Sequence, residues 1–121
     1  MTNVNEWEQT LFQLILHAGS ARCSAKEAAE FAEAGKWEEA ETALAEANDE
    51  QVKAHKVNTS IITRAARGED IEFSVLLVHA LDLLMLAWAE IDNTEQVIRM
   101  NKRISALEDE VKKWQDLASK K

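Results

Sequence analysis

Apolar and small side chains recur three and four residues apart along most of the chain, the spacing that places them on one face of a helix. Glycine interrupts this pattern at Gly35 and Gly68, as glycines that end helices do. Cutting the chain there predicts helices over about residues 5–34, 37–67 and 71–117. Alanine, glutamate, lysine and leucine, all good helix formers, dominate the three segments. Because strand patterns and Asn-Gly turns are missing, we expect an all-α antiparallel three-helix bundle with a long C-terminal helix.

The third predicted helix is apolar on almost every side between Val75 and Trp88. Two neighbouring helices leave part of such a surface uncovered, so we expect a second subunit to cover the rest. The run is too short, and too interrupted by His79 and Asp82, to span a bilayer. The pattern therefore predicts an oligomer.

Beyond Trp88 the apolar spacing becomes 3, 4, 3, 4, 3, through Val97, Met100, Ile104, Leu107, Val111 and Trp114. This spacing predicts a heptad-like C-terminal extension over residues 101–121. Such an extension can lie on its own bundle or pair with copies of itself. We favour self-association, because a short three-helix unit has little surface left for so long a tail.

Composition narrows the class of protein. A chain of 121 residues is one domain by size, and its net charge of −8 argues against nucleic-acid binding. The single cysteine, Cys23, excludes an internal disulfide and fits a reducing compartment; we expect it to be a small buried or half-buried residue. The N-terminal residues lack the basic-then-apolar layout of a secretion signal. We therefore expect the protein to be cytoplasmic.

His79 and Asp82 are the two polar side chains within the apolar run, three residues apart and so on one helix face. Burying them is costly unless they pair, bind something or take part in chemistry. A metal site needs more ligands, and His17 and His55 lie on other predicted helices. In a symmetric oligomer, one Asp82 from each subunit can form a shared oxygen cluster for a divalent cation. No serine-hydrolase, phosphate-loop or dinucleotide motif occurs.

Small residues gather at positions 17–21, HAGSA, in the first predicted helix. A glycine within a helix costs about 1 kcal/mol relative to alanine, so we expect a helix or a functional cleft close to this backbone. Of the four tryptophans, Trp37 is predicted to be a packing staple, and Trp7 and Trp114 are interface anchors or core residues.

Several runs together resemble the IIA component of the lactose/cellobiose-type sugar phosphotransferase system. They occur in the order and at the spacing of that family, over roughly residues 10–100. The runs are FQLILHAGSAR at 12–22, EA at 27–28, AGKWEEA at 34–40, AHKVNT at 54–59, ARG at 66–68 and SVLLVHALDLLM at 74–85.

The resemblance implies three-helix subunits that assemble as a homotrimer. It implies that His79 is the catalytic residue, which accepts a phosphoryl group from the histidine-containing phosphocarrier protein and passes it to the IIB component. Asp82 matches an aspartate that in some members meets its symmetry mates around a cation at the trimer axis. His55 matches a position on the second helix, where a hydrogen-bonded structural histidine is the simpler interpretation. No cofactor is required.

The chain departs from the family pattern beside the nucleophile. The family reads roughly HAQDHLM where this chain reads HALDLLM, so Leu81 replaces a glutamine and Leu83 a second histidine. Asn58 stands where glutamine is usual. The alternative interpretation is therefore a non-catalytic assembly protein, natural or engineered, built on the IIA trimer scaffold, with a designed partner subunit in the engineered case. The sugar is not encoded in this chain, because the IIA component never touches it.

Overall fold

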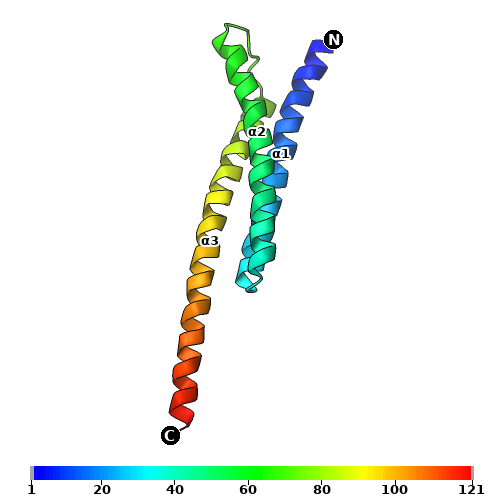
Figure 1. The fold of residues 1–121 in the computed structure, drawn as a ribbon. Coiled ribbons are helices and arrows are strands. Elements are labelled where there is room, and N and C mark those ends of the chain that lie inside the picture. Colours follow the sequence, from blue (N-terminus) through cyan, green and yellow to red (C-terminus); the bar gives the residue numbers. More distant parts are fainter. Residues whose placement is uncertain (1, 121) are drawn as a thin grey trace.

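The computed structural model describes residues 2–120, with side chains from Glu6 onward, so both ends of the predicted 1–121 domain lie outside the described residues. Three helices follow one another: α1 (Thr2–Glu33), α2 (Trp37–Ala66) and α3 (Val75–Ser119). They run alternately down, up and down, and α3 extends well past the α1–α2 turn (Figure 1). Helix α1 has the most extensive contacts with both other helices. The all-α antiparallel bundle with a long last helix is confirmed.

Glycines end the first two helices, as the pattern predicted. Gly35 has φ 75° and Gly68 has φ 81°, the left-handed conformation that side chains disfavour. At the first end, the Lys36 N–H donates to the Phe31 carbonyl at 2.9 Å and the Gly35 N–H donates to the Ala32 carbonyl at 3.1 Å. These two bonds satisfy carbonyls that the helix leaves free and turn the chain back on itself.

The third helix begins at Val75, four residues later than the sequence pattern indicated. Ser74 is extended, with φ −152° and ψ 159°, and its hydroxyl accepts a hydrogen bond from the Leu77 N–H at 3.1 Å. A serine oxygen that satisfies a free N–H is a favourable helix start. The apolar residues before Ser74 therefore belong to the connection from α2 and not to the helix.

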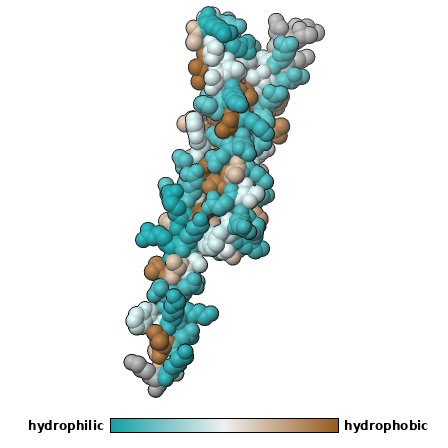
Figure 2. Space-filling view, in the orientation of Figure 1, coloured by the Kyte–Doolittle hydropathy of each residue, from teal (hydrophilic) through white to brown (hydrophobic). Residues whose placement is uncertain are grey.

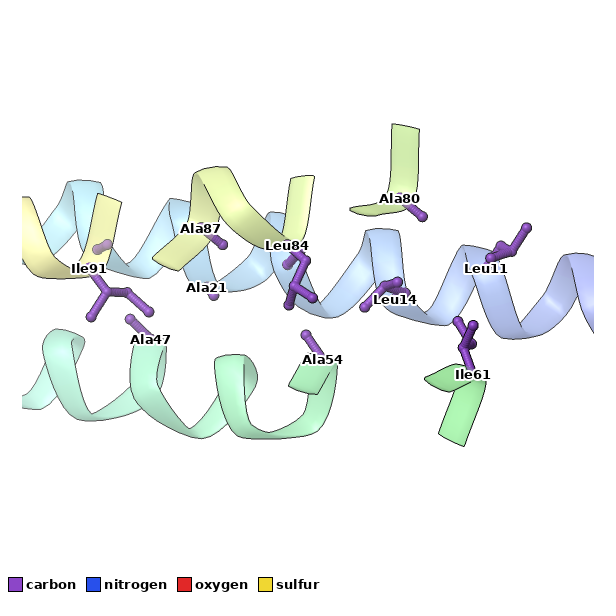
Figure 3. Close-up of a cluster of buried hydrophobic side chains, with 12 residues drawn as sticks. Leu11, Leu14, Ala21, Ala47, Ala54, Ile61, Ala80, Leu84, Ala87 and Ile91 are labelled. Carbon is purple, nitrogen blue, oxygen red and sulfur yellow. The ribbon is translucent and has the colours of Figure 1, made fainter. Parts of the chain in front are cut away.

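The core of the subunit is built mainly from alanine. Among the described residues, Leu11, Leu14 and Leu84 are the largest fully buried side chains, and eleven buried alanines line the remaining helix contacts. Figure 3 shows Leu84 of α3 between the alanines of α1 and α2. Small side chains let helices approach closely but bury little apolar area. The larger apolar side chains are left outside this core.

Many of those larger side chains are exposed in the single subunit. They include Phe12 and Leu16 of α1, Val52 and Ile62 of α2, and Val75, Val78, Met85, Leu86 and Trp88 of α3. An apolar surface spread over three helices is unusual for a monomer and marks an association surface. It agrees with the expected oligomer.

Two sequence-based expectations need correction at single positions of α1. The close helix contact expected at residues 17–21 is found at Ala18 and Ala21, which are fully buried in the core, but a Cβ atom added at Gly19 meets nothing within 4 Å. Gly19 lies beside the buried stripe, so no neighbour packs on the glycine itself. Cys23, predicted to be buried or half-buried, is exposed because it falls between stripe positions.

The C-terminal part of α3 does not return to the bundle. From Ala106 to Lys120 every described residue is exposed, and Figure 2 shows apolar patches among the polar side chains of this segment. Within the subunit, the tail therefore does not lie on its own bundle.

Within residues 2–120, no helix combines the length and apolar character that crossing a membrane requires.

Candidate functional site

His79 and Asp82 lie on the side of α3 that faces away from α1 and α2. Both are exposed, whereas Ala80 and Leu84, on the opposite side of the same turns, are buried in the core. The spacing of three residues places both polar side chains on this outer face. The chain itself does not bury them, because only one side of α3 packs inward, so any burial has to come from another subunit.

Neither side chain has a hydrogen-bond or ion-pair partner among the residues that the structure describes. No bond joins His79 to Asp82, so the interpretation as an internally satisfied pair is not supported by the subunit. The surroundings are apolar instead: Val75, Val78, Met85 and Leu86 are all exposed on the neighbouring turns. The outer face of α3 is thus an apolar surface with one free imidazole and one free carboxylate.

Leu81 and Leu83 flank this outer face. Both are partly buried and pack against the main core cluster. Leu83 lies one turn after His79, at the i+4 position, where a polar side chain would be within reach of the imidazole. A leucine at this position offers an apolar wall and no hydrogen-bond donor.

A single chain cannot hold a metal ion at this place. Among the described residues, no three His, Cys, Asp or Glu side chains gather in a suitable cluster. Asp82 contributes one carboxylate per subunit, and divalent cations such as Ca²⁺ take six or more oxygen ligands. A cation at Asp82 would therefore need carboxylates from other copies and bound water.

The other two histidines are tied to structural partners. The Nδ1–H of His17 donates to Glu50 Oε2 at 2.7 Å, which joins α1 to α2. This hydrogen bond is the main reason that the pKa of Glu50 lies below its usual value of 4.5. His55 is exposed and lies against Trp88, with ring centroids 5.6 Å apart and the planes tilted by 54°. The hydrogen bond expected for His55 is not found among the described residues, so both His55 and His79 have free ring nitrogens, and His79 lacks the aromatic contact as well.

The packing of the tryptophans agrees in part with the roles predicted from the sequence. Trp37 packs on a second cluster of buried alanines with Ile98, as a staple would. Trp7 packs against the main core, with the Arg64 guanidinium 5.2 Å from its ring centroid. Trp114 is 70% exposed and so is not a core residue of the subunit. It remains available as an anchor in an interface.

Sequence reasoning missed two buried polar side chains. Thr94 of α3 donates its hydroxyl to the Ala25 carbonyl of α1 at 3.1 Å. Gln51 of α2 donates to the Leu84 carbonyl at 3.4 Å, and its own Oε1 is buried without a partner among the described residues. The burial of Gln51 could have been predicted from its spacing, because it lies four residues after Ala47 and three before Ala54, on the buried stripe of α2.

Known proteins match most of this chain. The family model for the lactose/cellobiose-specific IIA subunit of the phosphotransferase system matches residues 9–102. The lichenan-specific phosphotransferase enzyme IIA component of Bacillus subtilis (strain 168) is 42% identical over 100 residues, 83% of this chain and 91% of the relative. The lactose-specific EIIA component of Streptococcus mutans is 40% identical over 102 residues, 83% of this chain and 98% of the relative.

A solved structure agrees with the sequence comparison. The crystal structure of the cellobiose-specific enzyme IIA from Bacillus anthracis superposes with a TM-score of 0.81 at 43% identity. The match covers 83% of this chain and 92% of that one. The bundle and its outer α3 face are thus common to a known group of proteins, whereas residues 103–121 lie beyond the range matched by the family model.

Proposed function

Because this chain belongs to the lactose/cellobiose-specific IIA family of the sugar phosphotransferase system, we propose that it relays a phosphoryl group through His79. The group comes from the histidine-containing phosphocarrier protein and goes to the IIB component, in the cytoplasm. The observation that carries the proposal is the free, exposed imidazole of His79 on the outer face of α3. His17 instead donates to Glu50, and His55 lies against the Trp88 ring.

The transfer suits an imidazole. The lone pair of one neutral ring nitrogen attacks phosphorus, while the other nitrogen keeps its proton. A nitrogen–phosphorus bond forms at His79 as the nitrogen–phosphorus bond of the donor breaks, and that bonding pair stays on the donor imidazole. The same exchange with the nucleophile of the IIB component returns His79 to its starting state. An exposed position on a rigid helix lets two partners reach the ring in turn.

Because of two leucines beside His79, we expect phosphoryl transfer to be slower than in a protein that has polar side chains at these positions. Leu81 and Leu83 replace the glutamine and histidine that the family resemblance places there, so they supply no donor to the phosphoryl oxygens. Stabilisation of developing charge by fixed donors is a large term in catalysis. We therefore expect Leu83→His to raise the phosphorylation rate about tenfold or more, and Leu83→Met to leave it unchanged.

The relay is proposed to operate in a homotrimer. Large apolar side chains on all three helices are exposed in the subunit and need covering. Asp82 lies in the middle of the outer α3 face, so threefold symmetry would bring three carboxylates together. Three negative charges repel unless a divalent cation or protons neutralise them. A chelator should lower the melting temperature of the protein and have no effect on Asp82→Asn.

The decisive test is intact mass before and after incubation with phosphoenolpyruvate, the general first enzyme of the system and the phosphocarrier protein. We expect a gain of one phosphoryl group that His79→Ala abolishes and that His17→Ala and His55→Ala retain. Circular dichroism and light scattering check that every variant is folded and assembled. A folded, assembled chain that gains no mass would overturn the relay.

The second candidate is a non-catalytic assembly protein on the same scaffold. Leu81 and Leu83 favour it, because both make the surroundings of His79 more apolar while packing on the core. This candidate predicts no gain of mass and normal assembly after His79→Ala. Failure of Leu83→His to gain mass would also support it, since that variant restores a polar neighbour.

A further inference from the structure

The tail of α3 carries a continuous apolar line that nothing in the subunit covers. We define this tail seam as Met100, Ile104, Leu107, Val111 and Trp114, spaced 4, 3, 4 and 3 residues apart. Each side chain is at least half exposed, up to 70% for Trp114. Residues on the opposite side of the same turns, such as Lys102, Asp109 and Asp116, are polar. The segment therefore has one apolar face and one solvent face.

A projecting helix of this kind is not stable by itself. Residues 103–119 extend about 25 Å at roughly 1.5 Å per residue, beyond the end of the bundle (Figure 1). Isolated helices of this length are marginal in water, because their stability comes mostly from packing an apolar face. The tail seam accordingly requires a partner of similar length.

The tail seam lies on the same side of α3 as Asp82, after a polar interruption at Asn93 and Gln96. Met100 follows Asp82 by 18 residues, which is about five turns at roughly 3.6 residues per turn, so both lie on the same side of α3. The core-facing stripe, which includes Leu84, Ile91 and Ile98, lies on the other side. Copies that meet along the Asp82 face therefore bring their tails side by side, pointing the same way.

The charges beside the tail seam match a parallel, in-register arrangement. In a heptad written abcdefg, Ile104 and Val111 take position a, and Leu107 and Trp114 take position d. Arg103 is then at position g and Glu108 at position e, five residues later. In parallel coiled coils, position g of one strand lies beside that e position of the next, so Arg103 meets Glu108 of a neighbour. The next pair, Glu110 and Gln115, carries no like charges.

We propose that residues 100–118 form a parallel coiled coil with the same segment of the other copies of this chain. The occupant of the tail seam is thus the tail seam itself. The count of three strands rests on the trimer proposed above, whereas the pairing does not depend on phosphoryl transfer. The d positions are Met100, Leu107 and Trp114, and only one of them is leucine. The pattern of β-branched a residues and leucine d residues that favours two strands is therefore incomplete.

Disulfide trapping tests the register. In a Cys23→Ser background, Val111→Cys places one thiol at an a position, where identical residues of parallel strands meet. Lys113→Cys, two residues away on the solvent side, is the matched control. Under mild oxidation at micromolar concentration, Val111→Cys should form covalent dimers at least about tenfold faster than the control. Equal rates at both positions, or no covalent dimer from Val111→Cys, would overturn the coil.

Charge reversal tests the pairing between chains. Arg103→Glu alone and Glu108→Arg alone should each weaken association several-fold, measured by sedimentation equilibrium. The double variant should restore it, because residues five apart do not face each other on one helix but meet across strands. Additive losses in the double variant would contradict parallel pairing.

A single apolar-to-charged change separates this inference from the proposed relay. Leu107→Glu buries an unpaired charge in the coil and should lower the association constant at least about a hundredfold. Ala106→Glu adds the same charge one residue earlier, away from the tail seam, and should have little effect. Both should still accept a phosphoryl group at His79 if the relay is right. Unchanged association of Leu107→Glu would refute the coil and leave the relay standing.

Discussion

The two parts of α3 on either side of Ile98 differ in how many apolar faces they have. From Val75 to Trp88 the helix has two, one packed on α1 and α2 and one carrying His79 and Asp82. Asn93 and Gln96 then interrupt the outer face. After Ile98 the core-facing stripe becomes polar, through Lys102, Ser105 and Asp109, while the outer face is apolar again from Met100. Helix α3 leaves the bundle where its core-facing apolar stripe ends, and its outer apolar face needs a partner from another chain beyond that point.

The largest effect should come from truncating a core side chain in the first part. Leu84 is 2% exposed and lies between both other helices. Leu84→Ala should lower the free energy of unfolding by about 3 kcal/mol, since it removes buried area and leaves a cavity. Urea denaturation measures this loss, which should not depend on protein concentration. A loss below about 1 kcal/mol would mean that the Ala-rich core collapses around the site.

The same substitution in the second part should act only through association. Leu107→Ala removes no contact within the subunit, because this side chain is 63% exposed there. We expect a loss of about 1–2 kcal/mol per chain at high protein concentration and a flatter dependence of the melting temperature on concentration. Thermal melts over a hundredfold concentration range measure it. A loss equal at every concentration would show that the tail packs within its own chain.

The core-facing stripe of α3 can be compared at two positions by removing a hydroxyl. Thr94 donates to the Ala25 carbonyl, so Thr94→Val should cost about 1 kcal/mol at nearly unchanged volume. Ser105 lies 11 residues later on the same side, where the bundle has ended and its hydroxyl bonds to no other described residue. Ser105→Ala should change stability by less than about 0.5 kcal/mol. Equal losses would mean that the hydroxyl bond of Thr94 contributes nothing measurable.

The smallest effect should be a pH dependence confined to the bundle. Because the hydrogen bond from His17 holds the pKa of Glu50 below 4.5, the folded state binds this proton less readily than the unfolded state. The resulting stabilisation is present above pH 4.5 and is lost as the pH falls through the lowered pKa. Its size should stay below about 1 kcal/mol, since both side chains are partly exposed.

Glu50→Gln is the matched variant for this pH dependence. It keeps an acceptor for His17 but removes the titrating group. Unfolding by urea from pH 6 to pH 3 should show a steeper acid loss in the original chain than in the variant. Parallel pH profiles would contradict a role for the pair.

Much of the fold was predictable because its signals are local. Glycine at positions 35 and 68 ended the helices, and spacings of three and four residues identified the stripes. The start of α3 was misplaced because apolar residues before Ser74 continue the helical spacing, and only the cap marks the true start. The exposure of His79 within the subunit was not predictable either, because an apolar run around a helix does not reveal which of its faces the chain itself covers.

The amino-acid sequence by itself determined three helices, their ends at the two glycines, the family resemblance and the heptad spacing of the tail. The helices, their ends and the heptad spacing depend on residues close together in the chain, and the resemblance depends on short runs in a given order along it. Only the tertiary structure decided that His79 and Asp82 lie outside the core, that His17 meets Glu50, and that the tail leaves the bundle. Those facts depend on how helices rotate and stack against one another, and buried alanines permit many such arrangements until all the contacts are made together.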